Sequence, residues 1–294
     1  MKFSATTLAV AAALGVAAHP SGFAHKNFHR QLDKRIDFYM NAKPEGAVVN
    51  NKAAVVPSPA EPTVTSVTSP PPAPATTSAA KPTSSSGSGS GGKKQFCGGV
   101  SKRASAADIA YKGNVGAPND YGCNLMLVDD AKDYEYTATI ENKSGKAQKC
   151  ACWLKISKDG GINGFFIGNQ VMTFDLAAGG QKILAAEPNS QGGCSCGVGE
   201  VPTNSIGLIT GTWLEFDFAN SKNNNWSGAD ASCLTAAQSK SYIPALSVCA
   251  DGHECSTIKE GGEGKNAYTE GTNNLDGVGL NIAPGPINFK VTVG

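Results

Sequence analysis

The sequence predicts an all-β fold, an antiparallel β-sandwich, for residues 96–294. Short segments in which apolar and polar residues alternate follow one another at close spacing, with Gly, Asn and Asp between them, which is the pattern of strands joined by tight turns. Helical periodicity is weak throughout. All nine cysteines also lie in this region, so we expect disulfide-stapled loops around the sheets.

Each expected strand is bounded by residues that form turns. The segments 142–145, 159–161 and 178–180 supply Gly and Asn, which accept positive φ. At most one or two short helices are expected, the best candidate being 229–239, which Asp230 or Ser232 could cap. The strands that the alternation predicts are 134–141, 150–157, 171–176, 182–187, 213–218 and 287–293.

The segment 213–218 carries the most unusual residues. Its apolar face holds Leu214, Phe216 and Phe218, and its opposite face holds Trp213, Glu215 and Asp217. After a polar loop come Trp226 and Asp230. Aromatic rings beside carboxylates suit a sugar-binding cleft, because a sugar ring offers CH faces to an aromatic ring and hydroxyls to acceptors. The alternative is an exposed edge strand with incidental acids.

The N-terminal part of the sequence predicts that the protein is secreted. Residues 1–18 form a signal peptide with cleavage after Ala18, because Lys2 precedes an apolar run too short to span a bilayer. Residues 19–35 contain three of the four histidines, which would suit metal binding, but the dibasic end at Arg35 favours a discarded pro-segment. Residues 36–95 are rich in Pro, Ser, Thr and Gly, which predicts a disordered linker.

Nine cysteines in a secreted chain predict a disulfide framework with one thiol left over. Two pairs have a spacing of i, i+2, so in strands each pair faces one side and the two pairs could bridge each other. A four-thiolate metal site is the alternative, although a single intervening residue is not the spacing of zinc knuckles. A local bridge between the last two is also expected. The cysteines are Cys97, Cys123, Cys150, Cys152, Cys194, Cys196, Cys233, Cys249 and Cys255.

Several function classes are disfavoured. The net charge is +1 and no basic stripe is present, which argues against nucleic-acid binding. The domain holds one histidine, His253, so neither histidine catalysis nor a His-rich metal site is expected, and we predict no cofactor, no metal and no membrane span. Two Asn-x-Ser sequons, at Asn142 and Asn225, predict N-glycosylation.

A set of short motifs runs through residues 96–290. They are Tyr111-Lys112-Gly113-Asn114-Val115-Gly116, Pro118, Asn124, Asp159-Gly160-Gly161, Gly168-Asn169, Asn189-Ser190-Gln191-Gly192, Trp213-x-Glu215-Phe216-Asp217-Phe218, Trp226-Ser227-Gly228-x-Asp230, Ala267-Tyr268 and Pro284-Gly285-Pro286. In their order and number these motifs resemble the secreted fungal Asp-f-four-like allergen family. This resemblance implies an extracellular fungal protein that human IgE can recognise, with no settled biochemical activity.

More distantly, the chain is similar to thaumatin-like proteins. That resemblance implies an acidic cleft between a β-sandwich and a loop-rich region, and some of those proteins bind β-1,3-glucan while a few cleave it. In this chain Glu215 would match the strand glutamate and Asp230 the loop aspartate, whereas Asp217 has no secure counterpart.

Three functions remain open from the sequence. The first is a non-catalytic extracellular or cell-wall protein that binds β-glucan through Trp213, Glu215, Asp217, Trp226 and Asp230. The second is a glycoside hydrolase of the endo-β-1,3-glucanase kind, whose candidate catalytic acids are Glu215, Asp217 and Asp230. The third is a structural or host-interacting secreted protein without a small ligand, in which these acids are solvated surface and the tryptophans cap a core.

Overall fold

The computed structural model describes residues 93–99, 113–275 and 277–294. The predicted signal peptide with its cleavage after Ala18, the pro-segment ending at Arg35 and the linker up to residue 92 lie outside the described residues. Two large sheets, a small two-stranded sheet and their connections account for the described part. Its helices are all short, and none of them is long and apolar enough to cross a membrane.

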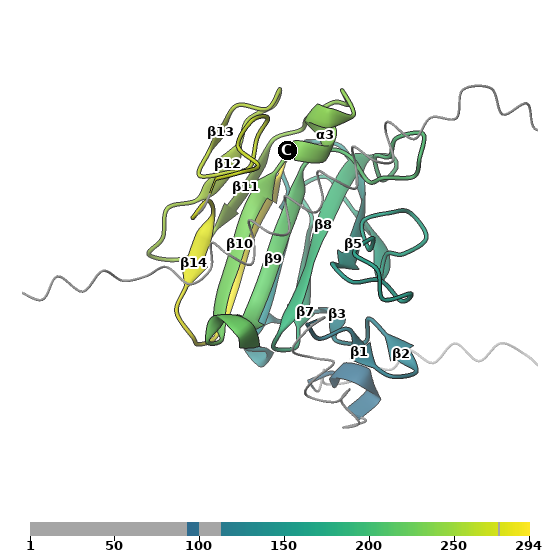
Figure 1. Cartoon of the computed structure of the whole chain (residues 1–294), viewed down its shortest axis with the longest axis vertical. Helices are drawn as coiled ribbons and strands as arrows, with labels where there is room; N and C mark the ends of the chain where they lie inside the picture. Colours follow the sequence, from purple (N-terminus) through teal and green to yellow (C-terminus); the bar gives the residue numbers. More distant parts are fainter. Residues whose placement is uncertain (1–92, 100–112, 276) are drawn as a thin grey trace, which may run out of the picture. The chain divides into compact units, whose positions relative to one another are not determined.

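The first large sheet has six strands and carries the segment from Trp213 (Figure 1). All of its strand pairs are antiparallel. In spatial order the strands are β14 (Leu280–Ile282), β10 (Trp226–Ser232), β9 (Trp213–Asn220), β8 (Ser190–Val198), β5 (Gln148–Leu154) and β6 (Met172–Leu176).

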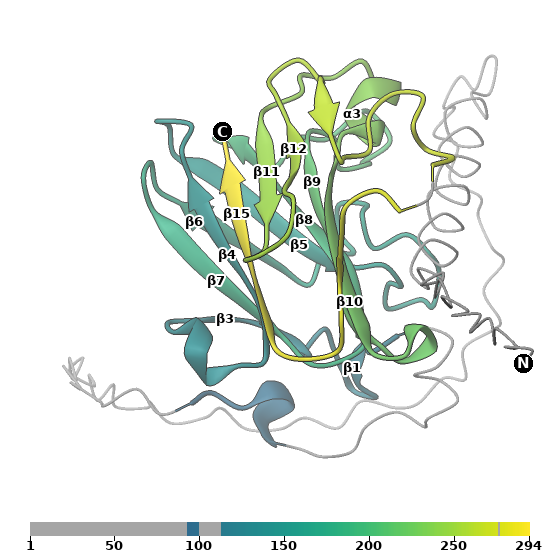
Figure 2. The same cartoon turned by 90° about the vertical axis from the view of Figure 1, so that its left-hand side faces the viewer.

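The second large sheet has seven strands, and a small sheet pairs β1 (Gly116–Ala117) with β2 (Asp120–Tyr121). Strand β15 lies between β11 and β4 (Figure 2) and runs parallel to β4. In spatial order the seven strands are β13 (Gly264–Lys265), β12 (Ser256–Ile258), β11 (Leu246–Cys249), β15 (Ile287–Val293), β4 (Tyr136–Asn142), β7 (Gln181–Ala186) and β3 (Leu125–Val128).

The predicted all-β sandwich is confirmed. One core joins the inner faces of both sheets, because Phe216 and Phe218 of β9 lie in the same buried cluster as Phe289 of β15. The rings of Phe218 and Phe289 are 5.4 Å apart. Strand β9 also has neighbours on both sides, so the alternative of an exposed edge strand is wrong.

Two details differ from the sequence-based expectations. The pairing of β4 with β15 is parallel rather than antiparallel. Asp230 and Ser232 do not cap a helix, because β10 extends through Ser232 and the helix α3 spans only Leu234–Gln238. The residue before α3, Cys233, makes no side-chain capping hydrogen bond. Cross-strand pairing with β9 therefore extends the strand into residues that the sequence suggested were helical. The remaining short turns of 3₁₀ type are Phe96–Gly99, Ala131–Asp133 and Ser221–Asn223.

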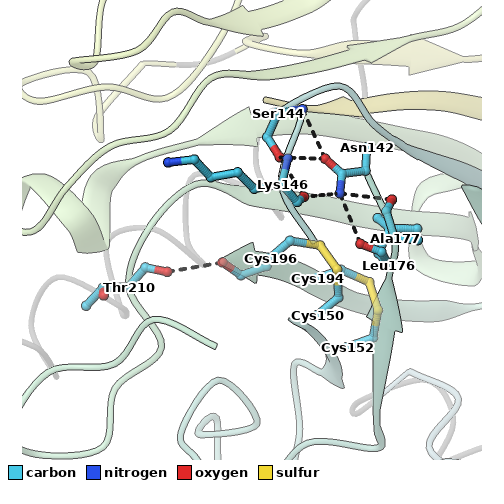
Figure 3. The surroundings of a disulfide bond; sticks show 11 residues. Asn142, Ser144, Lys146, Cys150, Cys152, Leu176, Ala177, Cys194, Cys196 and Thr210 are labelled. Carbon is cyan, nitrogen blue, oxygen red and sulfur yellow. Dashed lines mark hydrogen bonds between the residues drawn. A yellow bond between two sulfur atoms is a disulfide. The ribbon is translucent and has the colours of Figure 1, made fainter. Parts of the chain in front are cut away.

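Two disulfides link neighbouring strands at the centre of the first sheet (Figure 3). Cys150 pairs with Cys196 and Cys152 with Cys194, each across directly opposed positions of β5 and β8. All four sulfur-bearing side chains are buried in the core. The two i, i+2 pairs thus bridge each other, as the spacing allowed, and the four-thiolate alternative is wrong.

Two further disulfides hold loops. Cys97 is joined to Cys123, and Cys249 is joined to Cys255 as expected for a local bridge. The remaining cysteine, Cys233, is a free and buried thiol. Four disulfides are consistent with a protein that folds in an oxidising compartment.

Cys233 should be inert towards thiol reagents in the native protein. Burial, with a smaller contribution from the charge of Glu270, raises the pKa of its thiol to about 11. At pH 8 only about 0.1% of it is then thiolate, and the raised pKa keeps it protonated until the pH approaches that value. Ellman's reagent should detect one thiol per chain after unfolding without reductant and almost none before. A full equivalent from the native protein would contradict this.

Candidate functional site

The outer face of the six-stranded sheet carries the predicted acids. Glu215 and Asp217 lie two residues apart on β9, and Asp230 of β10 stands directly opposite Glu215. Directly opposed residues of neighbouring strands point to the same face, with Cβ atoms about 4.5–5.5 Å apart. The three candidate acids are therefore brought together. Asp230 lies in a strand, so its expected position on a loop is wrong.

Other polar side chains extend this face across the sheet. Gln191 of β8 stands opposite Asp217. On the other side of β9, Gly228 of β10 stands opposite Asp217 and, across the next strand pair, opposite Asn281 of β14. Lys155, just after β5, donates from Nζ to Oε1 of Gln191 at 2.9 Å. We call Lys155, Gln191, Asp217 and Asn281 the polar row. All four are partly exposed.

The polar row carries both charge signs. Burial lowers the pKa of Lys155, and the nearby charge of Lys222 lowers it further, whereas the negative charges of Asp217 and Glu215 act to raise it. Burial has the largest effect, so the ammonium form of Lys155 is destabilised in spite of the two carboxylates. Asp217 also accepts a hydrogen bond at 2.6 Å from Nδ2 of Asn220.

Trp213 does not belong to an accessible face. Its side chain is 1% exposed and lies in a second, smaller core with Trp153 and Phe165. Its ring lies 4.9 Å from that of Trp153, edge to face, and 5.6 Å from that of Phe165. Leu208 and Ile209 close this core from a loop. The expectation that Trp213 stacks on a ligand is therefore contradicted, because the loops cover this end of the face.

The three acids differ in how far they are exposed to solvent. Glu215 is 3% exposed and Asp230 is 2% exposed, whereas Asp217 is partly exposed. Asp217 and Asp230 line one narrow pocket together with Asn223, of about 30 Å³. That volume holds a water molecule or one small group, and it is far too small for a sugar ring. Trp226 is not among the residues that line this pocket.

The two predicted glycosylation sites differ sharply. Asn142 is fully buried, and its Nδ2, the atom that would carry the glycan, donates to the carbonyls of Lys146, Leu176 and Ala177 (Figure 3). The prediction at Asn142 is therefore contradicted by the fold. Asn225 is exposed, in the turn before β10.

Sequence reasoning missed the partners of the acids. Lys155 lies inside the predicted segment 150–157, and Gln191 lies inside one of the motifs that carry the family resemblance. Their sequence positions alone did not place them beside β9. Among the described residues, no group of three or more His, Cys, Asp or Glu side chains is placed to hold a metal ion.

The fold and the site define a class of protein: a disulfide-stapled β-sandwich with a polar row across one outer face. The chain belongs to the Allergen Asp f 4-like family, because the model of the Allergen Asp f 4-like domain matches residues 123–293. It is thus a member of a family of allergen-type fungal proteins, and the resemblance seen in the sequence is confirmed.

One curated relative and two solved structures illustrate the similarity. Allergen Asp f 4 of Aspergillus fumigatus is 34% identical over 194 residues, which cover 64% of this chain and 59% of that protein. The chain therefore matches about three fifths of its relative's length. The protein elicitor MoHrip2 from Magnaporthe oryzae has 12% identity and a TM-score of 0.34, covering 54% of this chain and 98% of that one. The thaumatin-like xylanase inhibitor TLXI has 11% identity and a TM-score of 0.34, covering 53% and 97%.

Proposed function

We propose that the protein is secreted and binds cell-wall polysaccharide, such as β-1,3-glucan, without cleaving it. The observation that carries the proposal is the polar row. It crosses the sheet from Asn281 on β14 to Lys155 beside β5. Neighbouring strands lie about 4.8 Å apart, so the row offers donors and acceptors along roughly 19 Å. A linear chain of sugars presents hydroxyls at a similar repeat.

The row replaces the aromatic platform that the sequence suggested. Gln191 and Asn281 each offer both a donor and an acceptor, Asp217 is an acceptor and Lys155 is a donor. Gly228 leaves the row without a side chain on β10, which gives a polysaccharide room to approach the backbone. Binding of this kind relies on hydrogen bonds to hydroxyls rather than on ring stacking.

Catalysis has less support than binding. Glu215 and Asp230 form the closest pair of opposed acids, but both are buried. A glycosidase needs its two carboxyl groups on either side of a bound sugar bond. The pocket beside Asp230 has no room for a sugar ring. We therefore propose a binding role for Asp217 and an indirect, structural role for Glu215 and Asp230.

Co-sedimentation with insoluble β-1,3-glucan, chitin and cellulose tests the proposal. The double variant Gln191→Ala/Asn281→Ala should raise the Kd about thirtyfold, since two hydrogen-bonding groups contribute about 1 kcal/mol each. The matched control Asp129→Asn/Gln181→Ala changes two exposed polar residues away from the row and should bind like the wild type. Equal binding by both double variants would remove the row from the proposal.

A second candidate is a structural or host-interacting extracellular protein without a small ligand. The burial of Trp213, Glu215 and Asp230 favours it, since these residues then serve the core rather than a ligand. The same co-sedimentation separates the two functions. If the wild type binds none of the three polysaccharides, this second function replaces the first.

The proposal has three further parts. IgE recognition is proposed because the chain belongs to an allergen family, and it is checked by IgE binding of the purified chain in sera from sensitised donors. Secretion is proposed from the predicted signal peptide and the disulfides. Asn225 is the proposed glycan acceptor, which glycopeptide mapping of the secreted protein checks.

A further inference from the structure

The pocket that Asp217 and Asn281 of the polar row line together with Asp230, Asn223 and Tyr268 is rich in hydrogen-bond acceptors. Asp217 and Asp230 contribute carboxylates, and Asn223 contributes an amide. Asn223 is 7% exposed, and its buried Oδ1 accepts no hydrogen bond among the described residues. A buried acceptor without a donor costs about 1–3 kcal/mol. The pocket is therefore suited to a group that brings several donors.

The charge and the volume of the pocket restrict the kind of chemical group that it can bind. Three carboxylates lie on this face, Glu215 and Asp230 being directly opposed and Asp217 two residues along β9. A volume of about 30 Å³ admits the end of a side chain and excludes a saccharide unit. A guanidinium or ammonium group fits both conditions, because it is positive and carries three to five N–H donors with no acceptor.

The chain itself contains a segment with this chemistry. Residues 19–35 hold Lys26, Arg30, Lys34 and Arg35 against a single acid, Asp33. Roughly 60 residues separate Arg35 from the first described residue, a contour length of about 200 Å. A domain of about 200 residues has a radius of gyration near 16 Å, so the tether does not restrict which surface the segment reaches.

We propose that the acceptor pocket of Asp217, Asp230 and Asn223 binds a Lys or Arg side chain of residues 19–35 of the same chain. The segment then covers the polar row until the chain is cut after Arg35, and removal of the segment exposes the row. The docking stands on the pocket alone, whereas its consequence for polysaccharide binding rests on the proposed function.

Carbodiimide cross-linking of the uncut chain at low salt tests the docking. This reagent joins a lysine to a carboxylate in contact with it, and peptide mass spectrometry should find Lys26 or Lys34 joined to Asp217 or Asp230. The variant Asp217→Asn/Asp230→Asn should lose these links. The control Asp129→Asn/Asp251→Asn removes two exposed acids elsewhere and should keep them.

A variant with substitutions only in residues 19–35 distinguishes a loss of docking from a folding defect of the domain. Arg30→Gln/Arg35→Gln keeps both lysines for cross-linking, removes two positive charges and leaves residues 93–294 unchanged, and it should reduce the yield of these links severalfold. Links spread over the exposed acids, or unchanged in Asp217→Asn/Asp230→Asn, would overturn the docking. The docking would also be overturned if no cross-link formed and millimolar Ca²⁺ raised the Tm, because the pocket would then hold a metal ion.

The regulatory consequence has its own readout. Cleavage after Arg35 and removal of the segment should increase β-1,3-glucan binding severalfold, and Arg30→Gln/Arg35→Gln should show the same increase without cleavage. Specific cross-links together with no glucan binding before or after cleavage would sink the polysaccharide function and leave the docking intact. Glucan binding that cleavage does not change, with no specific cross-links, would refute the docking and leave the polysaccharide function intact.

Discussion

Trp213→Ala should lower the free energy of unfolding by about 3–5 kcal/mol. The side chain is 1% exposed and packs against Trp153 and Phe165, so truncation leaves a cavity that the β-sheet backbone cannot close. Urea unfolding followed by circular dichroism measures the change. This loss would be a stability effect, because the ring is not accessible to a ligand.

The matched control is Tyr242→Ala, which removes an aromatic side chain that is 67% exposed. It should change the free energy of unfolding by less than about 1 kcal/mol. A Trp213→Ala protein as stable as the wild type, but unable to bind glucan, would contradict the structure and return Trp213 to the role that the sequence suggested.

Loss of both cross-strand disulfides should cost far more than loss of either one. Cys150–Cys196 and Cys152–Cys194 have sequence separations of 46 and 42, and one such loop constrains the unfolded chain by about 4 kcal/mol. With either bridge intact, the second closes only a ring of a few residues. Removal of one bridge by Cys→Ala pairs should therefore cost about 2 kcal/mol, and removal of both about 6 kcal/mol.

Cys249→Ala/Cys255→Ala serves as a comparison, because this bridge has a sequence separation of 6 and nothing duplicates it. It should cost about 2 kcal/mol by the same relation. Chemical denaturation of the four proteins under non-reducing conditions gives the comparison. If the costs of the two single removals add up to that of the double, the redundancy is refuted.

The local pattern was sufficient for much of the fold. Alternation of apolar residues located β9 and placed Phe216 and Phe218 on the core side, and β15 was predicted with its observed bounds. Strand β8 was missed, since Ser190–Val198 is rich in Gly, Ser and Cys. Its glycines have low strand propensity, and pairing with β5 and β9 makes the segment a strand.

The site was predicted only in part, for a different physical reason. The sequence identified Glu215, Asp217 and Asp230 as a group, and the register of β9 and β10 brings them together. It also treated their face as open to solvent. Whether a face is open depends on loops elsewhere in the chain, here those carrying Phe165 and Leu208. The contact of Lys155 with Gln191 spans 36 residues and has no local signature.

The position of β15 has a consequence for the order of synthesis. Strands β4 and β11 are joined in their sheet only through β15, which is made after both of them. The seven-stranded sheet therefore stays in two parts while the ribosome adds the intervening residues, and its core closes only once Ile287–Val293 has emerged. The two halves of this sheet therefore cannot join before β15 is available to pair with both β4 and β11.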